Sequence, residues 1–237
     1  MKKILFSILC CPAFMLFVKA QVYTYPIQSG TENWKKLKSH SEMLKATKLP
    51  MEYLNVQSAD LLQSCLSYPL LFDYTAYNNP YYGFKKVVLQ SNVLSEFMKR
   101  KDNGMALLNY YKSVDINSIN LLKNEIEQGN LTLTLTAVEF MMSDSTALRS
   151  LSKDKRTELM DYLKDVIILK EKNVHTFGTN GIISSLFLAS RILDLSGNAE
   201  WKEFCIRNES IVTFMNNYVP NKELISNIQA FITQLKN

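Results

Sequence analysis

The stretch Leu131-Thr-Leu-Thr-Leu-Thr136, which runs on as Ala137-Val-Glu-Phe-Met-Met142, decides the fold class of this chain. Its first six residues alternate between apolar and polar, which is typical of a half-buried strand, and threonine favours strands. The second half has helical spacing, since Val138, Met141 and Met142 recur at intervals of three and four. A lone strand would have no partner here, so we predict that the whole stretch is helical.

Glycine and proline are scarce, with 7 and 6 residues in a chain of 237, which leaves few residues suited to the tight turns of a sheet-rich fold. Apolar residues instead recur at helical spacing between short breaks. We predict an all-α fold, an irregular array of about nine or ten short antiparallel helices with no sheet. The other expected helices cover residues 31–47, 58–67, 92–101, 103–112, 152–172 and 182–195, with two more beginning near Pro80 and at Pro220.

The strongest helical patterns lie in the C-terminal half. Residues 182–195 are apolar on most sides, which predicts the most buried helix of the fold. The segment after Pro220 has the clearest amphipathic pattern, and proline is tolerated at a first helical position. Its apolar stripe consists of Leu224, Ile228, Phe231 and Leu235.

The first twenty residues have the pattern of a secretory signal. A basic head, Met1 to Lys3, precedes an apolar run from Ile4 to Phe17, and Val18-Lys-Ala20 places small residues where signal peptidase reads them. We predict that residues 1–20 are a signal peptide removed before Gln21 and that residues 21–237 form a single helical domain. The chain would then be exported across a bacterial inner membrane to the periplasm, the cell surface or the medium.

Two other interpretations of this N-terminus fit less well. An uncleaved anchor would need about 20 apolar residues, and this run has roughly 14. Lipidation would use Cys10 or Cys11, but each follows a residue that is larger than lipobox patterns favour. We therefore expect no transmembrane anchor after cleavage.

The basic charge of the chain belongs largely to the signal. Removal of Lys2, Lys3 and Lys19 lowers the formal net charge from +5 to +2. A nearly neutral chain with interspersed signs has no basic footprint for nucleic acid, so we expect no nucleic-acid partner.

Two cysteines remain after cleavage, Cys65 and Cys205, and both lie on apolar helical stripes. They are either buried small hydrophobes or, because export is oxidising, a disulfide that forms if their helices touch. His40 and His175 are the only histidines, and neither has a second ligand at suitable spacing. We predict no metal site and no cofactor.

Catalytic constellations are hard to find in this sequence. Gly178-Thr-Asn-Gly181 lacks the lysine and the preceding strand of a phosphate-binding loop and is better explained as a turn that begins a helix. Ser184 and Ser185 lie in an apolar helix, where small residues permit close packing. We assign no catalytic residue. Glu139 interrupts an apolar helix; it is an acid–base candidate or, alternatively, an exposed residue or a satisfied ion pair.

The richest local feature is the aromatic segment Tyr74 to Phe84, which holds five rings in eleven residues together with two asparagines. Rings and amides of this kind occur in carbohydrate and peptide sites. We predict a turn at Asn79-Pro80 that presents Tyr81 and Tyr82, with Tyr77 behind them. The candidate ligand-binding residues are Tyr77, Asn79, Tyr81 and Tyr82. The alternative is that these tyrosines pack on the core.

A resemblance to a group of known sequences is carried by residues in the N-terminal half: Leu49-Pro50-x-Glu52-Tyr-Leu54, Ser58, Leu61-Leu62, Cys65-Leu66-x-Tyr68-Pro69, Tyr77-Asn78, Gly83-Phe84, Asn92, Phe97-x-x-Arg100-Lys101-Asp102 and Leu107-Leu108-x-x-Tyr111. Over residues 34–112 the chain resembles uncharacterised secreted proteins of Bacteroidetes-type bacteria. The resemblance implies export and an all-helical domain, and it implies no activity. Asp144-Ser-Thr146 also resembles the acceptor pattern for O-glycosylation in such bacteria, although it would serve equally as a helix N-cap.

These features favour an exported, non-catalytic binding or interaction module of the bacterial cell envelope, with an envelope protein or glycan as its partner. The alternative is a hydrolase that acts on a cell-wall or dietary polymer through carboxylates such as Glu139. An open cleft containing Glu139 and a second carboxylate would favour the enzyme. A concave polar site lined by tyrosines would favour binding.

Overall fold

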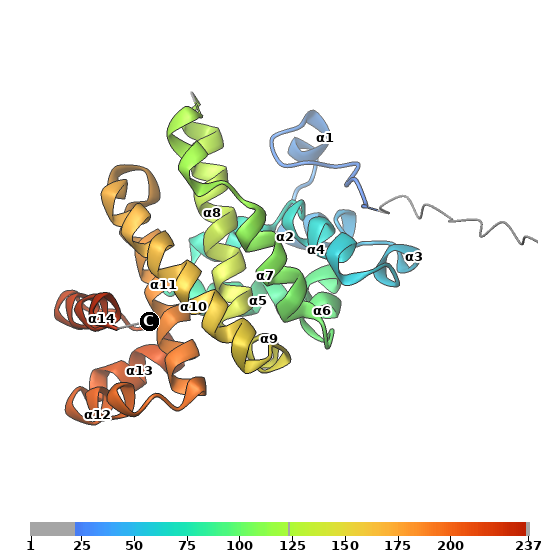
Figure 1. The fold of residues 1–237 in the computed structure, drawn as a ribbon. Coiled ribbons are helices and arrows are strands. Elements are labelled where there is room, and N and C mark those ends of the chain that lie inside the picture. The colour runs from blue at the N-terminus through green and yellow to red at the C-terminus, as the bar shows by residue number, and fades with distance from the viewer. Residues whose placement is uncertain (1–21, 123, 236–237) are drawn as a thin grey trace, which may run out of the picture.

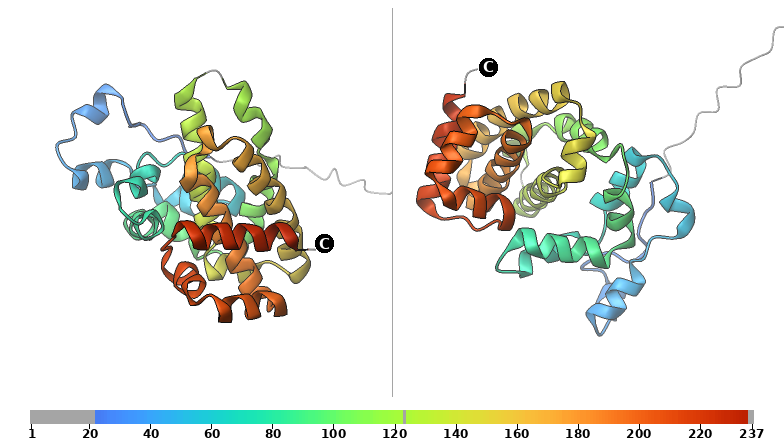
Figure 2. Two further views of the ribbon diagram at one scale, coloured as in Figure 1. Left: turned by 90° about the vertical axis from the view of Figure 1, so that its left-hand side faces the viewer. Right: turned by 90° about the horizontal axis from the view of Figure 1, so that it is seen from below.

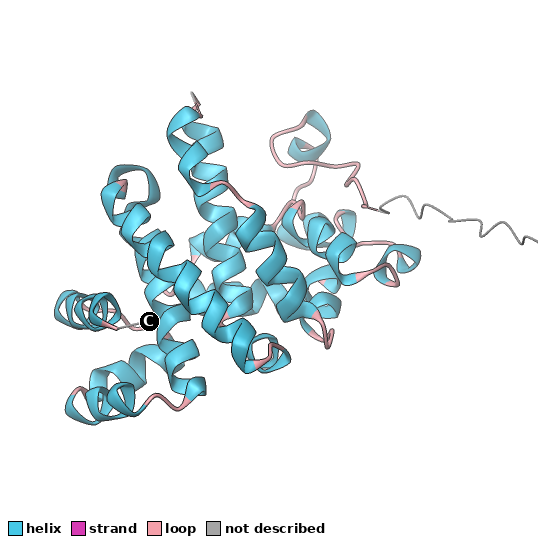
Figure 3. Cartoon of the chain, in the orientation of Figure 1, coloured by secondary structure: helices cyan, strands magenta, loops and turns pink. Residues whose placement is uncertain are grey.

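The computed structural model describes residues 22–122 and 124–235, and every regular element within them is a helix (Figure 3). The predicted signal peptide, residues 1–20, and the residue that follows it lie outside the described residues. The all-α fold class is confirmed for the described part of the chain. Its N-terminal half contains α1 (Glu32–Lys35), α2 (His40–Ala46), α3 (Met51–Leu54), α4 (Ser58–Leu66), η1 (Leu71–Ala76), α5 (Pro80–Gln90), α6 (Asn92–Met98), α7 (Asn103–Ser113) and η2 (Ile116–Leu121).

The longest helices lie in the C-terminal half, where α8 and α10 both pack against α11 (Figure 1). The short helices α12 to α14 lie at one side of this group, and α1 to α4 lie at the opposite side (Figure 2). The elements of this half are α8 (Glu125–Met142), α9 (Ser145–Ser150), α10 (Lys153–Lys172), α11 (Val174–Ser196), α12 (Ala199–Arg207), α13 (Glu209–Asn217) and α14 (Lys222–Gln234).

The alternating stretch 131–136 lies inside α8, so the prediction that it is helical is confirmed. Helix α8 begins at an N-cap, Asn124, whose side chain accepts a hydrogen bond from the backbone N–H of Ile126. Its last eight residues, 135–142, are all buried. Packing of α8 against α7 and α11 therefore outweighs the local preference of threonine for strands.

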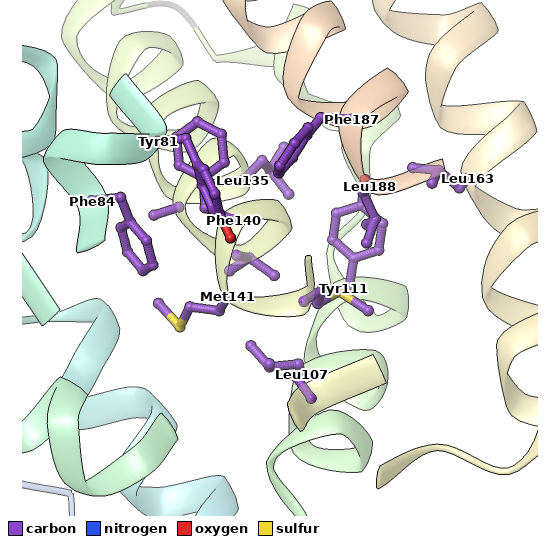
Figure 4. Close-up of a cluster of buried hydrophobic side chains, with 14 of the residues drawn as sticks. Tyr81, Phe84, Leu107, Tyr111, Leu135, Phe140, Met141, Leu163, Phe187 and Leu188 are labelled. Atoms are coloured by element: carbon purple, nitrogen blue, oxygen red, sulfur yellow. The ribbon is translucent and has the colours of Figure 1, made fainter. Parts of the chain in front are cut away.

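The predicted most buried helix is the centre of α11, where every residue from 181 to 190 is buried. Phe187 of this helix meets Tyr81 of α5 at a ring-centroid distance of 4.7 Å, and Tyr81 meets Phe140 of α8 at 5.4 Å (Figure 4). These rings join α5, α8 and α11 into one core.

Fourteen α-helices and two 3-10 helices occur within the described residues, more than the nine or ten that we expected. The expected helix at 31–47 is divided into α1 and α2, because Ser39 between them caps α2 by accepting a hydrogen bond from Glu42 N. Helices α1 and α3 contain only four residues each. One helical turn holds too few residues to show a 3.6-residue period in the sequence.

Several helix starts also differ from the expected ones. Pro220 precedes α14, whose N-cap is Asn221, so the proline is not the first helical residue. Ser91, rather than Asn92, caps α6. The Asn92 amide instead forms two hydrogen bonds with the backbone of Leu49, at 2.8 and 3.0 Å. Ser58 is the first residue of α4 rather than its cap.

The Asp144 side chain caps α9 by accepting a hydrogen bond from Thr146 N at 2.8 Å. The N-cap interpretation of Asp144-Ser-Thr146 is therefore confirmed. Ser145 and Thr146 are exposed, and their glycosylation remains a prediction.

Both described cysteines are free thiols, with Cys65 buried in α4 and Cys205 half-buried in α12. The two helices lie at opposite ends of the molecule (Figure 1), which explains why the disulfide considered above does not form. Within residues 22–122 and 124–235, no helix combines the length and the apolar character needed to cross a bilayer.

Candidate functional site

A hollow of about 530 Å³ lies where η1 and the start of α5 meet α8 and α11. Its walls include Tyr74 and Tyr77, the α8 residues Thr132 and Thr136, residues 177–181 of α11, and Tyr218, which follows α13. We call this hollow the tyrosine pocket. Its volume falls within the range of about 300 to 1,000 Å³ that is typical of small-molecule sites.

The α11 wall of the tyrosine pocket is shaped by a break in the helix. Gly178 has φ 64° and ψ 170°, a conformation that interrupts the helix. Residues other than glycine rarely adopt it. The regular, buried part of α11 resumes at Gly181. We expected residues 178–181 to form a turn that begins a helix. Helix α11 instead begins at Val174, and Gly178 is a break inside it.

The Tyr77 ring lies at the rim of the tyrosine pocket, and the residue is 38% exposed. Gly83 on α5 allows this placement, because a Cβ atom there would come within 2.7 Å of both Tyr77 Cδ2 and the Tyr74 carbonyl oxygen. The Tyr82 ring meets the Tyr77 ring edge to face at 6.1 Å and is itself exposed. Tyr77 therefore presents aromatic surface at the rim, and the Tyr82 ring, outside the pocket lining, packs against it.

Asn79 has a structural role beside the tyrosine pocket. Its Oδ1 atom accepts a hydrogen bond from Tyr82 N, which caps α5. Its Nδ2 atom donates to the carbonyl oxygens of Asn217 and Tyr218, at 2.6 and 3.2 Å. Asn79 thus holds Tyr218 against the beginning of α5.

The structure places Tyr81 in the core, where it is 6% exposed among aromatic rings. The expected turn at Asn79-Pro80 therefore presents Tyr82 but not Tyr81. The difference follows from helical geometry. Once Pro80 begins α5, Tyr81 falls on the buried stripe that contains Phe84 and Val87, whereas Tyr82, about 100° further round the helix, faces solvent. The packing alternative holds for Tyr81.

Tyr218 is the most unusual residue of the tyrosine pocket. It has φ 53° and ψ 54°, the left-handed conformation that residues other than glycine rarely adopt, and it is the only non-glycine residue with positive φ in the described chain. It is 97% buried, and its hydroxyl has no hydrogen-bond partner. The Thr132 hydroxyl, from α8, is also buried without a partner. Two buried donors therefore remain unsatisfied at this pocket.

The two buried tyrosines of the pocket stay protonated. Burial raises the pKa of Tyr218 far above its ordinary value, and the nearby Glu139 charge adds to this effect. Burial and Glu139 also raise the pKa of Tyr74, whose hydroxyl donates to the Leu133 carbonyl at 2.9 Å. Both side chains therefore offer neutral hydroxyls.

Glu139 lies beneath the pocket, one helical turn below Thr136, in a buried polar cluster. We call this the Glu139 cluster; it consists of Tyr111, Glu139, Lys170, Ser184 and Ser185. All five residues are fully buried. Lys170 Nζ donates to Glu139 Oε1 at 2.7 Å, and the carboxylate also accepts from the hydroxyls of Tyr111, Ser184 and Ser185. Glu139 therefore forms a satisfied ion pair with Lys170, which was one of the alternatives to an acid–base role.

The lysine of the Glu139 cluster is equally well satisfied. Besides Glu139, Lys170 Nζ donates to the Gly181 carbonyl at 2.8 Å and to Ser185 Oγ at 2.9 Å. Burial lowers the pKa of Lys170, and the Glu139 carboxylate opposes that shift. A serine beside a lysine could form a nucleophile and its base, but these atoms are shielded from solvent. The arrangement holds α8, α10 and α11 together and has no access for a substrate.

The described residues that line the tyrosine pocket include no charged side chain. Seven of them carry hydroxyls, namely three tyrosines and four threonines, and Asn78 and Asn180 add amides. Elsewhere, no group of three or more histidine, cysteine, aspartate or glutamate residues within the described ranges is arranged to hold a metal ion. The pocket offers hydrogen bonds and ring surface rather than acid–base or metal chemistry.

No protein-family model, curated protein or solved structure matches this chain.

The sequence indicated the pocket residues from the aromatic segment but not those from α8 or from the residues after α13. The aromatic segment indicated Tyr77 of the pocket and Asn79 beside it, whereas Tyr218 and Thr132 carry no local signal of their own. Lys170 and Tyr111 were also missed. A signal for Lys170 was present, because it continues the apolar spacing of Leu163 and Val166 on α10.

Proposed function

We propose that this chain is an exported, non-catalytic binding module of the bacterial cell envelope. The observation that carries the proposal is the tyrosine pocket, a concave polar site with aromatic walls and uncharged lining. Its partner would be an envelope glycan or an envelope protein. Recognition by rings and hydrogen bonds needs no catalytic group, and such sites typically combine apolar walls with a few convergent polar atoms.

The geometry favours binding over the hydrolase alternative. Hydrolysis through carboxylates needs two of them flanking the scissile bond in an accessible cleft. Glu139 is instead buried and neutralised by Lys170 at 2.7 Å, and no second carboxylate faces the pocket among its described lining residues.

Export is supported by the sequence pattern of residues 1–20 and by the resemblance over residues 34–112. Intact-mass measurement of the protein recovered from a producing bacterium tests it. We expect a chain that begins at Gln21 or its cyclised form. A species that retains residues 1–20, or a lipid mass on Cys10 or Cys11, would contradict this part of the proposal.

Binding through the tyrosine pocket is tested with residues 21–237 immobilised and exposed to detergent-solubilised native envelope. The variant Thr179→Trp places a large side chain at an exposed position of the pocket rim. We expect it to abolish the capture seen with the unmodified chain. Thr233→Trp, the same change at an exposed position of α14, is the matched control and should capture normally. Equal capture by all three chains would refute the proposal.

A further inference from the structure

A second hollow, of about 300 Å³, lies where α9 and α11 meet α12 and α13, and it shares no described lining residue with the tyrosine pocket. Three helices each contribute one face to it: residues 145, 148 and 149 of α9, residues 191, 194 and 195 of α11, and residues 212, 215 and 216 of α13. Residues three and four apart lie on one side of a helix, so these three faces enclose the same space. We call this hollow the arginine pocket.

The lining of the arginine pocket carries a net positive charge. Its charged residues are Arg149, Arg191 and Asp194, which leaves a net charge of +1. The arginine ion pairs within residues 22–122 and 124–235 are those of Arg100 and Arg207, so neither arginine of the pocket has a carboxylate partner there. An anion that enters the pocket therefore meets two guanidinium groups that are not already neutralised by an ion pair.

Arg191 is held in place by the protein. Its Nη1 atom donates a hydrogen bond to the Met215 carbonyl oxygen at 2.7 Å, and its guanidinium carbon lies 5.6 Å from the centre of the Phe187 ring. Its Nη2 atom forms no hydrogen bond with the described residues, and it is not among the buried atoms that lack a partner. Nη2 therefore keeps accessible surface. A donor that is positioned before a ligand arrives lowers the entropy cost of binding.

Asp194 limits the charge of the ligand. Its side chain is exposed, and its charge adds to the effect of burial in raising the pKa of Cys205, which lines the same hollow. The Asp194 carboxylate therefore acts within the pocket. A dianion such as a phosphate monoester would be repelled by this like charge, whereas a carboxylate matches the net charge of +1 and fits the planar donors of arginine.

The rest of the lining indicates what the carboxylate is attached to. Apolar side chains form the walls between the charged groups, namely Leu148, Leu195, Val212 and Met215. Apolar walls with a few polar groups are typical of small-molecule sites, and a volume of about 300 Å³ is at the lower end of their range. The ligand therefore combines one carboxylate with a small hydrocarbon group.

We propose that the arginine pocket binds the carboxylate of a small apolar acid, with Arg149 and Arg191 Nη2 donating hydrogen bonds to its oxygens. The Arg149 side chain is exposed and forms no hydrogen bond or ion pair with the described part of the chain, so it is free to reach the ligand. A free acid and the C-terminus of a peptide that ends in an apolar residue both present this chemistry. The site is separate from the tyrosine pocket, and the inference goes beyond the proposed function without depending on it.

The test uses residues 21–237 and two acids, 4-methylpentanoate and N-acetyl-alanyl-leucine, each with its uncharged amide. Titration calorimetry at low ionic strength would measure binding. We expect at least one acid to bind, and its amide to bind at least about tenfold more weakly, because the amide loses the charge-assisted hydrogen bonds. Tighter binding of the free acid or of the peptide identifies the source of the carboxylate.

Three variants then assign the binding to the pocket. Arg149→Gln removes an exposed side chain that has no partner among the described residues, so it should weaken binding about fivefold to tenfold without lowering the melting temperature. Arg207→Gln, the same change at an exposed position of α12 outside the pocket, is the matched control and should leave binding unchanged. Asp194→Asn removes the like charge and should strengthen binding about twofold to fivefold.

Three results would overturn the inference. The first is that neither acid binds with a Kd below about 1 mM. The second is that an amide binds as tightly as its acid, since the carboxylate would then not be recognised. The third is that Arg149→Gln and Arg207→Gln have the same effect, since the binding would then lie outside the arginine pocket. The capture experiment with Thr179→Trp involves the other pocket, so its outcome is independent of all three.

Discussion

The carboxylate of Glu139 on α8 and the ammonium group of Lys170 on α10 lie 2.7 Å apart in the core, and neither side chain has any exposed surface. Removing one partner leaves the other as an uncompensated buried charge, which typically costs about 3 to 5 kcal/mol. The pair therefore joins two long helices, α8 and α10. The same lysine also donates a hydrogen bond to the Gly181 carbonyl of α11.

We predict that Glu139→Gln and Lys170→Met each lower the free energy of unfolding by about 3 to 5 kcal/mol. The double variant should lose less than the sum of the two single losses, because it leaves no unpaired buried charge. Urea unfolding followed by circular dichroism measures all three values. Strictly additive losses would show that the two residues do not interact.

The two adjacent tyrosines of α5 should respond differently to truncation. Tyr81→Ala removes a ring that is 94% buried between α8 and α11, and we expect a loss of about 3 to 5 kcal/mol. Tyr82→Ala removes a ring that is 49% exposed, and we expect a loss below about 1 kcal/mol. Thermal denaturation compares them directly. Similar falls in melting temperature would mean that Tyr82 is also a core residue.

An exposed ion-pair network links α7 to α10 and gives a pH-dependent signal. Hydrogen bonds from Lys112 and then Lys155 hold the pKa of Glu158 down at about 2. Because this folded-state pKa lies below the ordinary value near 4.5, the stabilisation is fully present above pH 4.5 and is lost as the pH falls toward 2. NMR titration of the carboxyl carbon measures the pKa. Lys112→Met should raise it, and an unchanged pKa would contradict the assigned cause.

The free thiols predict a simple labelling result. Burial, and then the charge of Asp194, raise the pKa of Cys205 to about 11, and burial raises that of Cys65 well above its usual range. Both thiols should therefore react slowly with N-ethylmaleimide in the folded protein. After unfolding without reductant, residues 21–237 should take up two labels, as counted by intact mass. No uptake would mean that the cysteines are bridged.

The fold class was predictable from periodicity and from the scarcity of glycine and proline, but the exact element boundaries were not. Asn92 could cap a helix by its residue type, yet its amide is occupied by the distant backbone of Leu49. Partners so far apart in sequence leave no local pattern. The same limit applies to the pocket, where Tyr218 becomes important only because Asn79 reaches it across the fold.

Buried polar groups were the hardest feature to interpret from the sequence. Glu139 was noticed because it interrupts an apolar run, and the ion-pair alternative was the correct one. Ser184 and Ser185 were expected only to allow close packing, but both donate hydrogen bonds to Glu139. A small side chain in an apolar helix is ambiguous until the acceptor that it faces is known.

The hydrogen bonds from Asn79 to the backbone of residues 217 and 218 connect positions 138 and 139 residues apart. The tyrosine pocket therefore has no wall at Tyr218 until nearly the whole chain has been synthesised and folded. Under the proposed export, the chain would cross the membrane from its N-terminus and would complete this wall last. Under the proposed binding function, recognition is therefore coupled to complete folding, and a truncated or half-folded copy would not compete with the complete protein for its partner.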